Sequence, residues 1–130
     1  MLRRNLLLGG RRIAVLGVTG CATHPVSVQQ ATELPAAQLR TCIKRAAHRR
    51  GWRVVTDEPG KMRIKYVKGP HVLVADVTYD NEGYMIEAVK EGSTLFNKDG
   101  TAHRKVNSWT ANLTVTIREE ENKILLRQTN

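Results

Sequence analysis

The sequence predicts an α+β fold in which a helix is followed by a four-stranded antiparallel sheet. Apolar residues within 35–50 recur at helical spacing, whereas residues 52–89 contain four short segments with the alternation of strands. Short turn sequences join these segments, and short connections join strands that run antiparallel, so we expect a meander. A chain of 130 residues has room for one hydrophobic core, and the prediction is a single domain over residues 35–126.

The helix is predicted over residues 35–50. Pro35 suits its first turn, where the missing N–H would have no partner within the helix. Gly51 suits the position after the last turn, and Arg49 and Arg50 lie favourably at the negative end of the helix dipole. The apolar stripe consists of Leu39, Cys42, Ile43, Ala46 and Ala47. We therefore expect Cys42 to be a small buried hydrophobic residue rather than a reactive thiol.

The four strands are predicted at residues 52–56, 61–67, 71–79 and 84–89. The connecting turns contain Asp57-Glu58-Pro59-Gly60, Gly69-Pro70 and Asp80-Asn81-Glu82-Gly83. In the second strand Met62, Ile64 and Tyr66 alternate with basic residues, which indicates one buried and one solvated face. The third strand is the most apolar, and we expect it at the centre of the sheet.

Residues 90–101 are predicted to be a loop, and residues 106–117 fit two structures. Trp109, Ala111, Leu113, Val115 and Ile117 alternate as in a strand. Val106, Trp109, Leu113 and Ile117 also share one helical face, and residues 118–127 are mostly good helix formers. The pattern alone does not decide between the two.

The first 21 residues have the layout of a bacterial export signal. Arginines precede a short apolar run, and small residues then lead to a cysteine. Val18-Thr19-Gly20-Cys21 resembles a lipobox, in which the cysteine thiol receives a diacylglyceryl group and the chain is cleaved before it. We predict a signal peptide at 1–20, lipidation of Cys21 and a flexible polar tether over 21–34. Arg11-Arg12 leaves open export by the twin-arginine route.

Charge and composition narrow the partners that we expect. The net charge is +9, but residues 1–20 hold four arginines and no acid, so 17 basic and 12 acidic residues remain, a net charge of +5. An exported protein does not normally meet nucleic acid, so anionic lipid or an envelope polymer is the expected acidic partner. In this interpretation the cations of the helix, together with Lys61, Arg63 and Lys65, form one basic surface that contacts the acidic partner. In the alternative, these cations only form a solvated face that keeps the domain soluble.

The sequence predicts neither a membrane-spanning helix nor a bound metal or cofactor. No apolar stretch reaches the roughly 18–20 residues that a membrane-spanning helix needs. The four histidines and two cysteines lack the spacing of metal ligands, so we predict no metal and no cofactor.

A set of short motifs is spread over about residues 40–117. It comprises Arg50-Gly51-Trp52, His71, Tyr84-Met85-Ile86, Ser93-Thr94-Leu95 and His103-x-x-x-Asn107-x-Trp109-x-x-Asn112-Leu113. Together with the lipobox, these motifs resemble a family of small bacterial lipoproteins that has no established activity. The resemblance implies a helix, an antiparallel sheet and a C-terminal helix that begins near the histidine.

The resemblance completes the prediction as a two-layer sandwich: a helix, a four-stranded antiparallel meander and a C-terminal helix over the ambiguous segment. It also implies outer-membrane placement, because Ala22 rather than Asp follows the cysteine. The chain departs from the family pattern at Ala88 and Val106, where aromatic residues are expected.

The candidate binding residues are His71, Tyr84, Ser93, His103, Asn107 and Trp109. They lie on elements that are expected to pack together, so we predict a small pocket with a stacking aromatic ring. In the structural alternative, Trp109 packs on the sheet while its N–H and the Asn107 amide satisfy loop carbonyls. Ser93, Asp99 and His103 have the residue types of a hydrolase triad, but no G-x-S-x-G motif accompanies them.

The predicted function is that of a non-catalytic binding or structural module. It would be an envelope lipoprotein that faces the periplasm and is anchored at the outer membrane through Cys21. Two alternatives stay open: an envelope hydrolase that uses Ser93 and His103, and a basic nucleic-acid-binding protein if the N-terminus does not direct export. The sequence indicates neither a particular ligand nor a protein partner.

Overall fold

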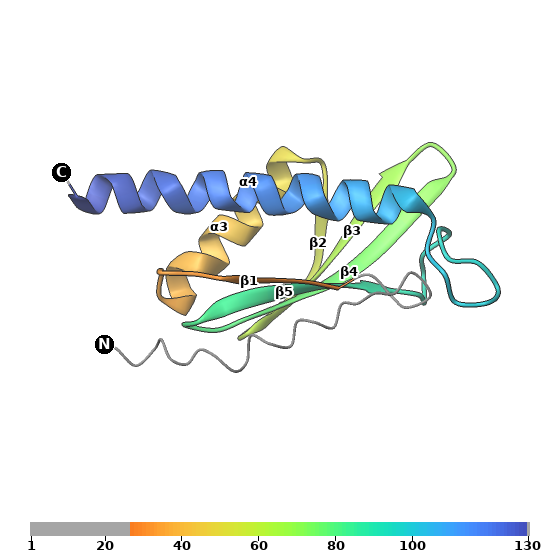
Figure 1. Ribbon diagram of the computed structural model, residues 1–130, viewed down its shortest axis with the longest axis horizontal. Coiled ribbons are helices and arrows are strands. Elements are labelled where there is room, and N and C mark those ends of the chain that lie inside the picture. Colours follow the sequence, from red (N-terminus) through yellow and green to blue (C-terminus); the bar gives the residue numbers. More distant parts are fainter. Residues whose placement is uncertain (1–26, 130) are drawn as a thin grey trace.

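The computed structural model describes residues 27–129, which form two layers (Figure 1). A five-stranded antiparallel sheet makes one layer, and two helices cover one of its faces. In chain order the elements are β1 (Ser27–Ala31), α3 (Ala36–Arg49), β2 (Arg53–Glu58), β3 (Lys61–Lys68), β4 (His71–Tyr79), β5 (Gly83–Val89) and α4 (Arg104–Thr129). The predicted two-layer α+β fold is confirmed. The predicted signal peptide, lipobox and lipidated Cys21 lie outside the described residues.

The sheet has the strand order β1-β5-β4-β3-β2, and every neighbouring pair is antiparallel. Strands β2 to β5 form the predicted meander because each follows its neighbour through a short turn. The apolar strand β4 occupies the middle of the sheet, as its composition predicted.

The fifth strand corrects the prediction of a flexible tether over residues 21–34 for the part from Ser27 onward, while residues 21–26 lie outside the described residues. Ser27–Ala31 is an ordered edge strand that pairs with β5, from Ser27 opposite Glu87 to Ala31 opposite Gly83. β1 alternates between exposed and partly buried residues, and Val28 packs against the core. Polar composition concealed this strand, because an edge strand buries only one side of a few residues and gains its backbone hydrogen bonds from a neighbour far along the chain.

Gly83 allows β1 to lie this close to β5. A Cβ atom built at Gly83 would lie 2.2 Å from the backbone oxygen of Gln30, and a backbone atom in a paired strand cannot rotate away. We therefore expect Gly83→Ala to push β1 off the sheet and to destabilise the protein by about 1–3 kcal/mol, the usual cost of overpacking. Hydrogen exchange should accelerate at Gln30 and Thr32, whose N–H groups are directed toward β5 and the turn before it, while β4 amides stay protected.

The matched control is Glu87→Ala, which truncates an exposed side chain of the same strand. It should leave exchange in β1 and the urea midpoint nearly unchanged. Unaltered protection of β1 in the Gly83→Ala variant would contradict the close approach.

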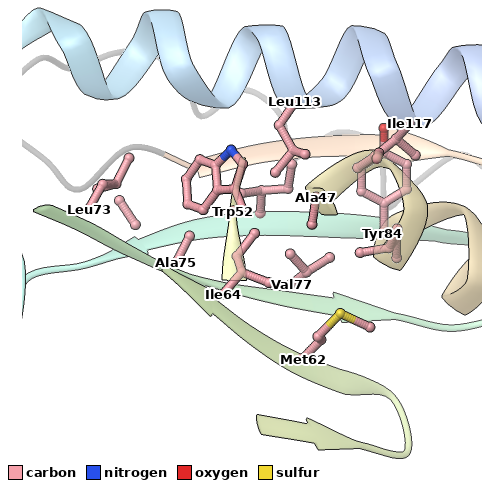
Figure 2. Close-up of a cluster of buried hydrophobic side chains, with 14 of the residues drawn as sticks. Ala47, Trp52, Met62, Ile64, Leu73, Ala75, Val77, Tyr84, Leu113 and Ile117 are labelled. Atoms are coloured by element: carbon pink, nitrogen blue, oxygen red, sulfur yellow. The ribbon is translucent and has the colours of Figure 1, made fainter. Parts of the chain in front are cut away.

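Apolar side chains from the sheet and from both helices meet in one core (Figure 2). The sheet contributes Met62, Ile64, Leu73, Ala75, Val77, Tyr84 and Ile86, and the helices contribute Leu39, Ile43, Ala46, Ala47, Val106, Leu113 and Ile117. Cys42 is buried on the predicted stripe of α3. Burial raises the pKa of its thiol to about 11, which keeps it protonated and unreactive near neutral pH.

The ambiguous C-terminal segment is helical. Val106, Leu113 and Ile117 are fully buried, whereas Val115 is 47% exposed. A strand would have placed Val115 on the same side as Leu113 and Ile117, so burial follows the helical face. α4 contains 26 residues and is about 39 Å long at 1.5 Å per residue, so it spans the sheet and continues along α3.

The start of α3 is held by a side chain from a distant turn. Pro35 occupies the N-cap position and makes no side-chain cap. Instead, the backbone N–H of Ala36 donates to Oδ1 of Asn81 in the β4–β5 turn, over 2.8 Å. The hydrogen bond fixes α3 to the end of the sheet that is formed by this turn.

Two adjacent carboxylates of α4 are buried against the rest of the domain. Glu120 is 4% exposed and accepts hydrogen bonds from Arg49 of α3 and from Lys123. Glu121 is 9% exposed and accepts a hydrogen bond from the hydroxyl of Thr32, just after β1. The two glutamates therefore tie α4 both to α3 and to the segment that follows the edge strand.

Glu121 makes stability depend on pH in a defined direction. Burial raises the pKa of its carboxyl, and the Thr32 hydroxyl offsets part of this rise. A raised folded-state pKa means that the contribution of this group to stability falls as the pH rises through that pKa. Glu121→Gln keeps an acceptor for Thr32 and removes the charge, so the variant should be more stable than wild type at pH 7.

The measurement is urea unfolding of both proteins at pH 7 and at pH 4, below the ordinary glutamate pKa of about 4.3. The advantage of the variant should shrink at the lower pH. A variant that is less stable than wild type at pH 7 would show that ionised Glu121 is stabilising.

Candidate functional site: a row of rings at one end of the sheet

Five aromatic and imidazole rings from four segments form a row, which we call the ring row: Trp52, Tyr66, Trp109, His71 and His103. Ring centroids lie 5.4 Å apart between Trp52 and Tyr66, and 4.7 Å apart between Tyr66 and Trp109, which meet edge to face at 75°. Trp109 is 6.5 Å from His71, and His71 is 6.3 Å from His103. These are the separations of interacting rings.

The solvent exposure of the rings increases along the row from Trp52 to His103. Trp52 is 5% exposed and lies between the sheet and α4 (Figure 2). Tyr66, Trp109 and His71 are partly exposed, and His103 is exposed. The buried tryptophan therefore supports the inner end of the row, and solvent reaches the rings at the outer end.

Local backbone geometry places the inner rings. Gly51 ends α3 with a φ of +85°, a conformation that favours glycine. The Trp52 N–H then donates to the carbonyl of Ala47, and the chain turns into β2 with the indole under α4. A Cβ at Gly51 would make ordinary van der Waals contact with the Tyr66 ring, at 3.4 Å from its nearest carbon, so the positive φ is what favours glycine here.

His103 caps the N-terminus of α4. Its Nδ1 accepts a hydrogen bond from the backbone N–H of Lys105 over 3.0 Å, and its carbonyl accepts one from Val106. A neutral imidazole that accepts at Nδ1 carries its proton on Nε2. The cap fixes the ring at the exposed end of the row.

The structure brings together three of the six predicted binding residues, His71, His103 and Trp109. Tyr84 lies in the core, 4% exposed, where burial raises its pKa. Asn107 is exposed on α4. These two residues and Ser93 have no place in the ring row.

Trp52 and Tyr66 belong to the row and were missed as site residues. Tyr66 sits on the helix-facing side of β3, as the alternation of that strand predicted, opposite Leu73. Its contact with Trp109 depends on where α4 crosses the sheet, which no local pattern contains. The sequence contains one signal for the contact between Trp52 and Tyr66. Trp52 opens the first predicted strand and Tyr66 lies near the end of the second, so an antiparallel pairing places both rings at the same end of the sheet.

Ser93 has a structural role at the edge of β4. Its Oγ donates to the carbonyl of Val89 over 2.6 Å and accepts from the N–H of Val74 over 2.8 Å. Thr94 Oγ1 accepts from the N–H of Val72, and the Thr94 N–H donates to the Val72 carbonyl. Ser93 and Thr94 therefore continue the pairing of β4 beyond the end of β5.

The three residues of the hydrolase alternative have separate local partners. The hydroxyl of Ser93 binds backbone groups, Nδ1 of His103 binds the start of α4, and Asp99 accepts hydrogen bonds from Thr101. The described hydrogen bonds join none of the three to another, so the geometry lends that alternative no support.

The predicted single basic surface is not formed. Met62 and Ile64 face the helices, so Lys61 and Arg63 point to the opposite, uncovered face of the sheet. Several cations on both sides are also in ion pairs, which are Arg40 and Lys44 with Asp57, Arg49 with Glu119 and Glu120, and Arg63 and Lys61 with Asp76. The hydrogen bonds from Arg63 hold the pKa of Asp76 below its ordinary value.

An open depression of about 530 Å³ adjoins the inner end of the ring row. It is lined by Lys44, His48, Gly51, Trp52, Arg53 and Val54. The ring that lines this depression is Trp52, which is the least exposed ring of the row. The more exposed rings Tyr66, Trp109 and His71 are therefore the better candidates for contact with a ligand.

The described part of the chain shows neither a metal-binding group of side chains nor a membrane-spanning helix. Residues 27–129 contain no group of three or more His, Cys, Asp or Glu side chains arranged to hold a metal ion. Neither of the two described helices combines the length and hydropathy required to cross a bilayer.

No family model, curated protein or solved structure matches this chain. The resemblance to small bacterial lipoproteins therefore stays a prediction from the motifs.

The role of Ser93 can be tested by removing its hydroxyl. Ser93→Ala leaves the amide of buried Val74 without its acceptor, so we expect a loss of about 1–3 kcal/mol in the free energy of unfolding. Urea denaturation followed by circular dichroism measures the loss. Ser108→Ala, at an exposed position on α4, is the matched control and should change little. Equal stability of the two variants would contradict the structural role.

Proposed function

We propose that this protein is a non-catalytic binding module held at a membrane by a lipid on Cys21, with the ring row as its binding surface. The observation that carries the proposal is that rings from four places in the chain, the residue before β2, β3, β4 and the N-terminal part of α4, lie together, and three of these rings are partly exposed beside a buried tryptophan. A core packed from the sheet and both helices supports them from beneath.

The chemistry of the row suits binding without a reaction. Tyrosine and tryptophan offer flat apolar faces with a polar group at one edge, and imidazole adds a hydrogen-bonding group. Such rings contact planar, glycosidic or interfacial groups with little loss of side-chain entropy, because packing already restricts them. The polar atoms of Ser93 and His103 hold backbone groups instead, which favours binding over hydrolysis.

Support for the anchor comes from the sequence: the basic residues, the short apolar run and Val18-Thr19-Gly20-Cys21. Metabolic labelling of cells with a clickable fatty acid tests it directly. The wild-type protein should carry label and fractionate with membranes, and Cys21→Ser should lose both properties. Unlabelled wild-type protein, or unchanged fractionation of the variant, would overturn the anchor.

Thiol counting gives an independent prediction. The sequence contains two cysteines, so acylation of the Cys21 sulfur leaves Cys42 as the one titratable thiol. Native protein purified from membranes should react slowly with a thiol reagent because Cys42 is buried with a pKa raised to about 11. After denaturation, one thiol per chain should react. The Cys42→Ala control should show none, and two thiols in the wild type would contradict acylation.

A further inference from the structure

We propose that the end of the domain that carries the ring row is a docking surface for an anionic phospholipid bilayer, so that the anchored domain rests on the membrane with this end down. The inference deepens the proposed function and rests on its anchor at Cys21. Three observations carry it: the distribution of charge between the two ends, the aromatic and apolar side chains that are exposed at this end, and the short length of chain before β1.

The first observation is an excess of cations around the ring row. The strand ends and connections that surround it carry Arg53, Lys65, Lys68, Lys90, Lys98, Arg104 and Lys105. The acidic residues of the same segments are Glu91 and Asp99. Within residues 27–129 none of the seven cations is in an ion pair, whereas six of the ten cations elsewhere in the domain, Arg40, Lys44, Arg49, Lys61, Arg63 and Lys123, are paired with Asp57, Asp76, Glu119 or Glu120. We call this region the basic end.

The opposite end of the sheet has the reverse character. Its turns, at residues 32–35, 58–61 and 80–83, contain Glu33, Glu58, Asp80 and Glu82 together with one lysine, Lys61. A bilayer with negative surface potential would therefore attract one end of the domain and repel the other. The asymmetry selects an orientation, which a uniform positive charge would not do.

The second observation concerns side chains beside the cations. Tyr66 and Trp109 are partly exposed, and Val67, the following residue of β3, is 57% exposed on the opposite face of the sheet at the same end. Aromatic rings with one polar edge favour the headgroup region of a bilayer, and lysines flank them here as they flank interfacial segments. The basic end therefore combines the electrostatic and the apolar contributions that bind proteins to anionic membranes.

The third observation is the length of chain between the anchor and the fold. β1 begins at Ser27, so only five residues separate it from Cys21. Six steps of chain reach at most about 20 Å, less than half the span that the predicted 21–34 tether would have allowed. A domain held this closely cannot leave the membrane surface, so its charge distribution decides which end makes contact.

Vesicle binding tests this inference without the lipid anchor. The full-length Cys21→Ser chain is mixed with vesicles of 30% phosphatidylglycerol in phosphatidylcholine, and with pure phosphatidylcholine vesicles, and the bound fraction is measured by sedimentation. In this background we compare a basic-end variant, Lys68→Glu, Arg104→Glu and Lys105→Glu, with a matched variant, Arg45→Glu, Arg118→Glu and Arg127→Glu. Both change the charge equally, at exposed or partly exposed positions, and both keep the N-terminal arginines.

The basic-end variant should lose binding to anionic vesicles by a factor on the order of 100, because each cation near such a surface contributes roughly a fivefold factor. The matched variant should lose far less, and thermal unfolding should show that both fold. Equal losses in the two variants would overturn the inference, as would failure of the parent chain to prefer anionic vesicles.

Orientation has its own measurement. Phosphatidylcholine with a spin label on its headgroup should quench tryptophan fluorescence of the bound parent chain, and Trp109→Phe should remove most of the quenching because Trp52 is buried. Quenching that persists in Trp109→Phe would place another surface at the membrane. These outcomes are independent of fatty-acid labelling, so failure of the anchor and failure of the docking surface are distinguishable.

Discussion

The sheet has one apolar face, and the burial of that face under α4 is the interaction on which the rest of the structure depends. α3 has 14 residues and covers part of the face, whereas α4 has 26 and crosses the remainder. Val106, Leu113 and Ile117 are fully buried in this contact, and each such side chain contributes roughly 1.5–3 kcal/mol. The same crossing places Trp109 against Tyr66, so the ring row follows from the way the core is closed.

Local patterns predicted the elements whose structure is decided locally. The stripe through Leu39 and Ile43 needs only helical spacing, and the meander needs only turns between short alternating segments. β1 was missed because its pairing with β5 depends on a free edge, and on the small size of Gly83, more than 50 residues away. The segment around Val115 satisfied two periodicities, and only packing against the sheet distinguishes them.

The candidate site was predictable in part for the same reason. His71, His103 and Trp109 were predicted as polar or amphipathic groups on elements that pack together, and the structure places them together. Tyr66 looked like an ordinary core residue of its strand, since its contact with Trp109 joins positions that are 43 residues apart. Ser93 looked like a site residue because the sequence does not distinguish two roles of a serine hydroxyl. The hydroxyl can form hydrogen bonds to the backbone of a strand, as it does here, or it can bind or react with a ligand.

Several of the motif residues have explicit structural roles. Gly51 ends a helix with positive φ, Ser93 and Thr94 extend a sheet, and His103 caps a helix. Arg50 donates to the hydroxyl of Thr116 and so links α3 to α4. The requirements of this fold are enough to explain why these residue types stand at these positions. The motifs therefore carry little information about a reaction.

The edge strand determines where this domain can be cut. A fragment that begins at Pro35 would keep both helices and the meander, yet it would strip β5 of its partner along five residues and remove the fully buried Leu34. Unpaired backbone at the rim of a sheet recruits strands from other molecules. Such a fragment would therefore be prone to self-association, whereas one that starts before Ser27 carries its own cover for that rim.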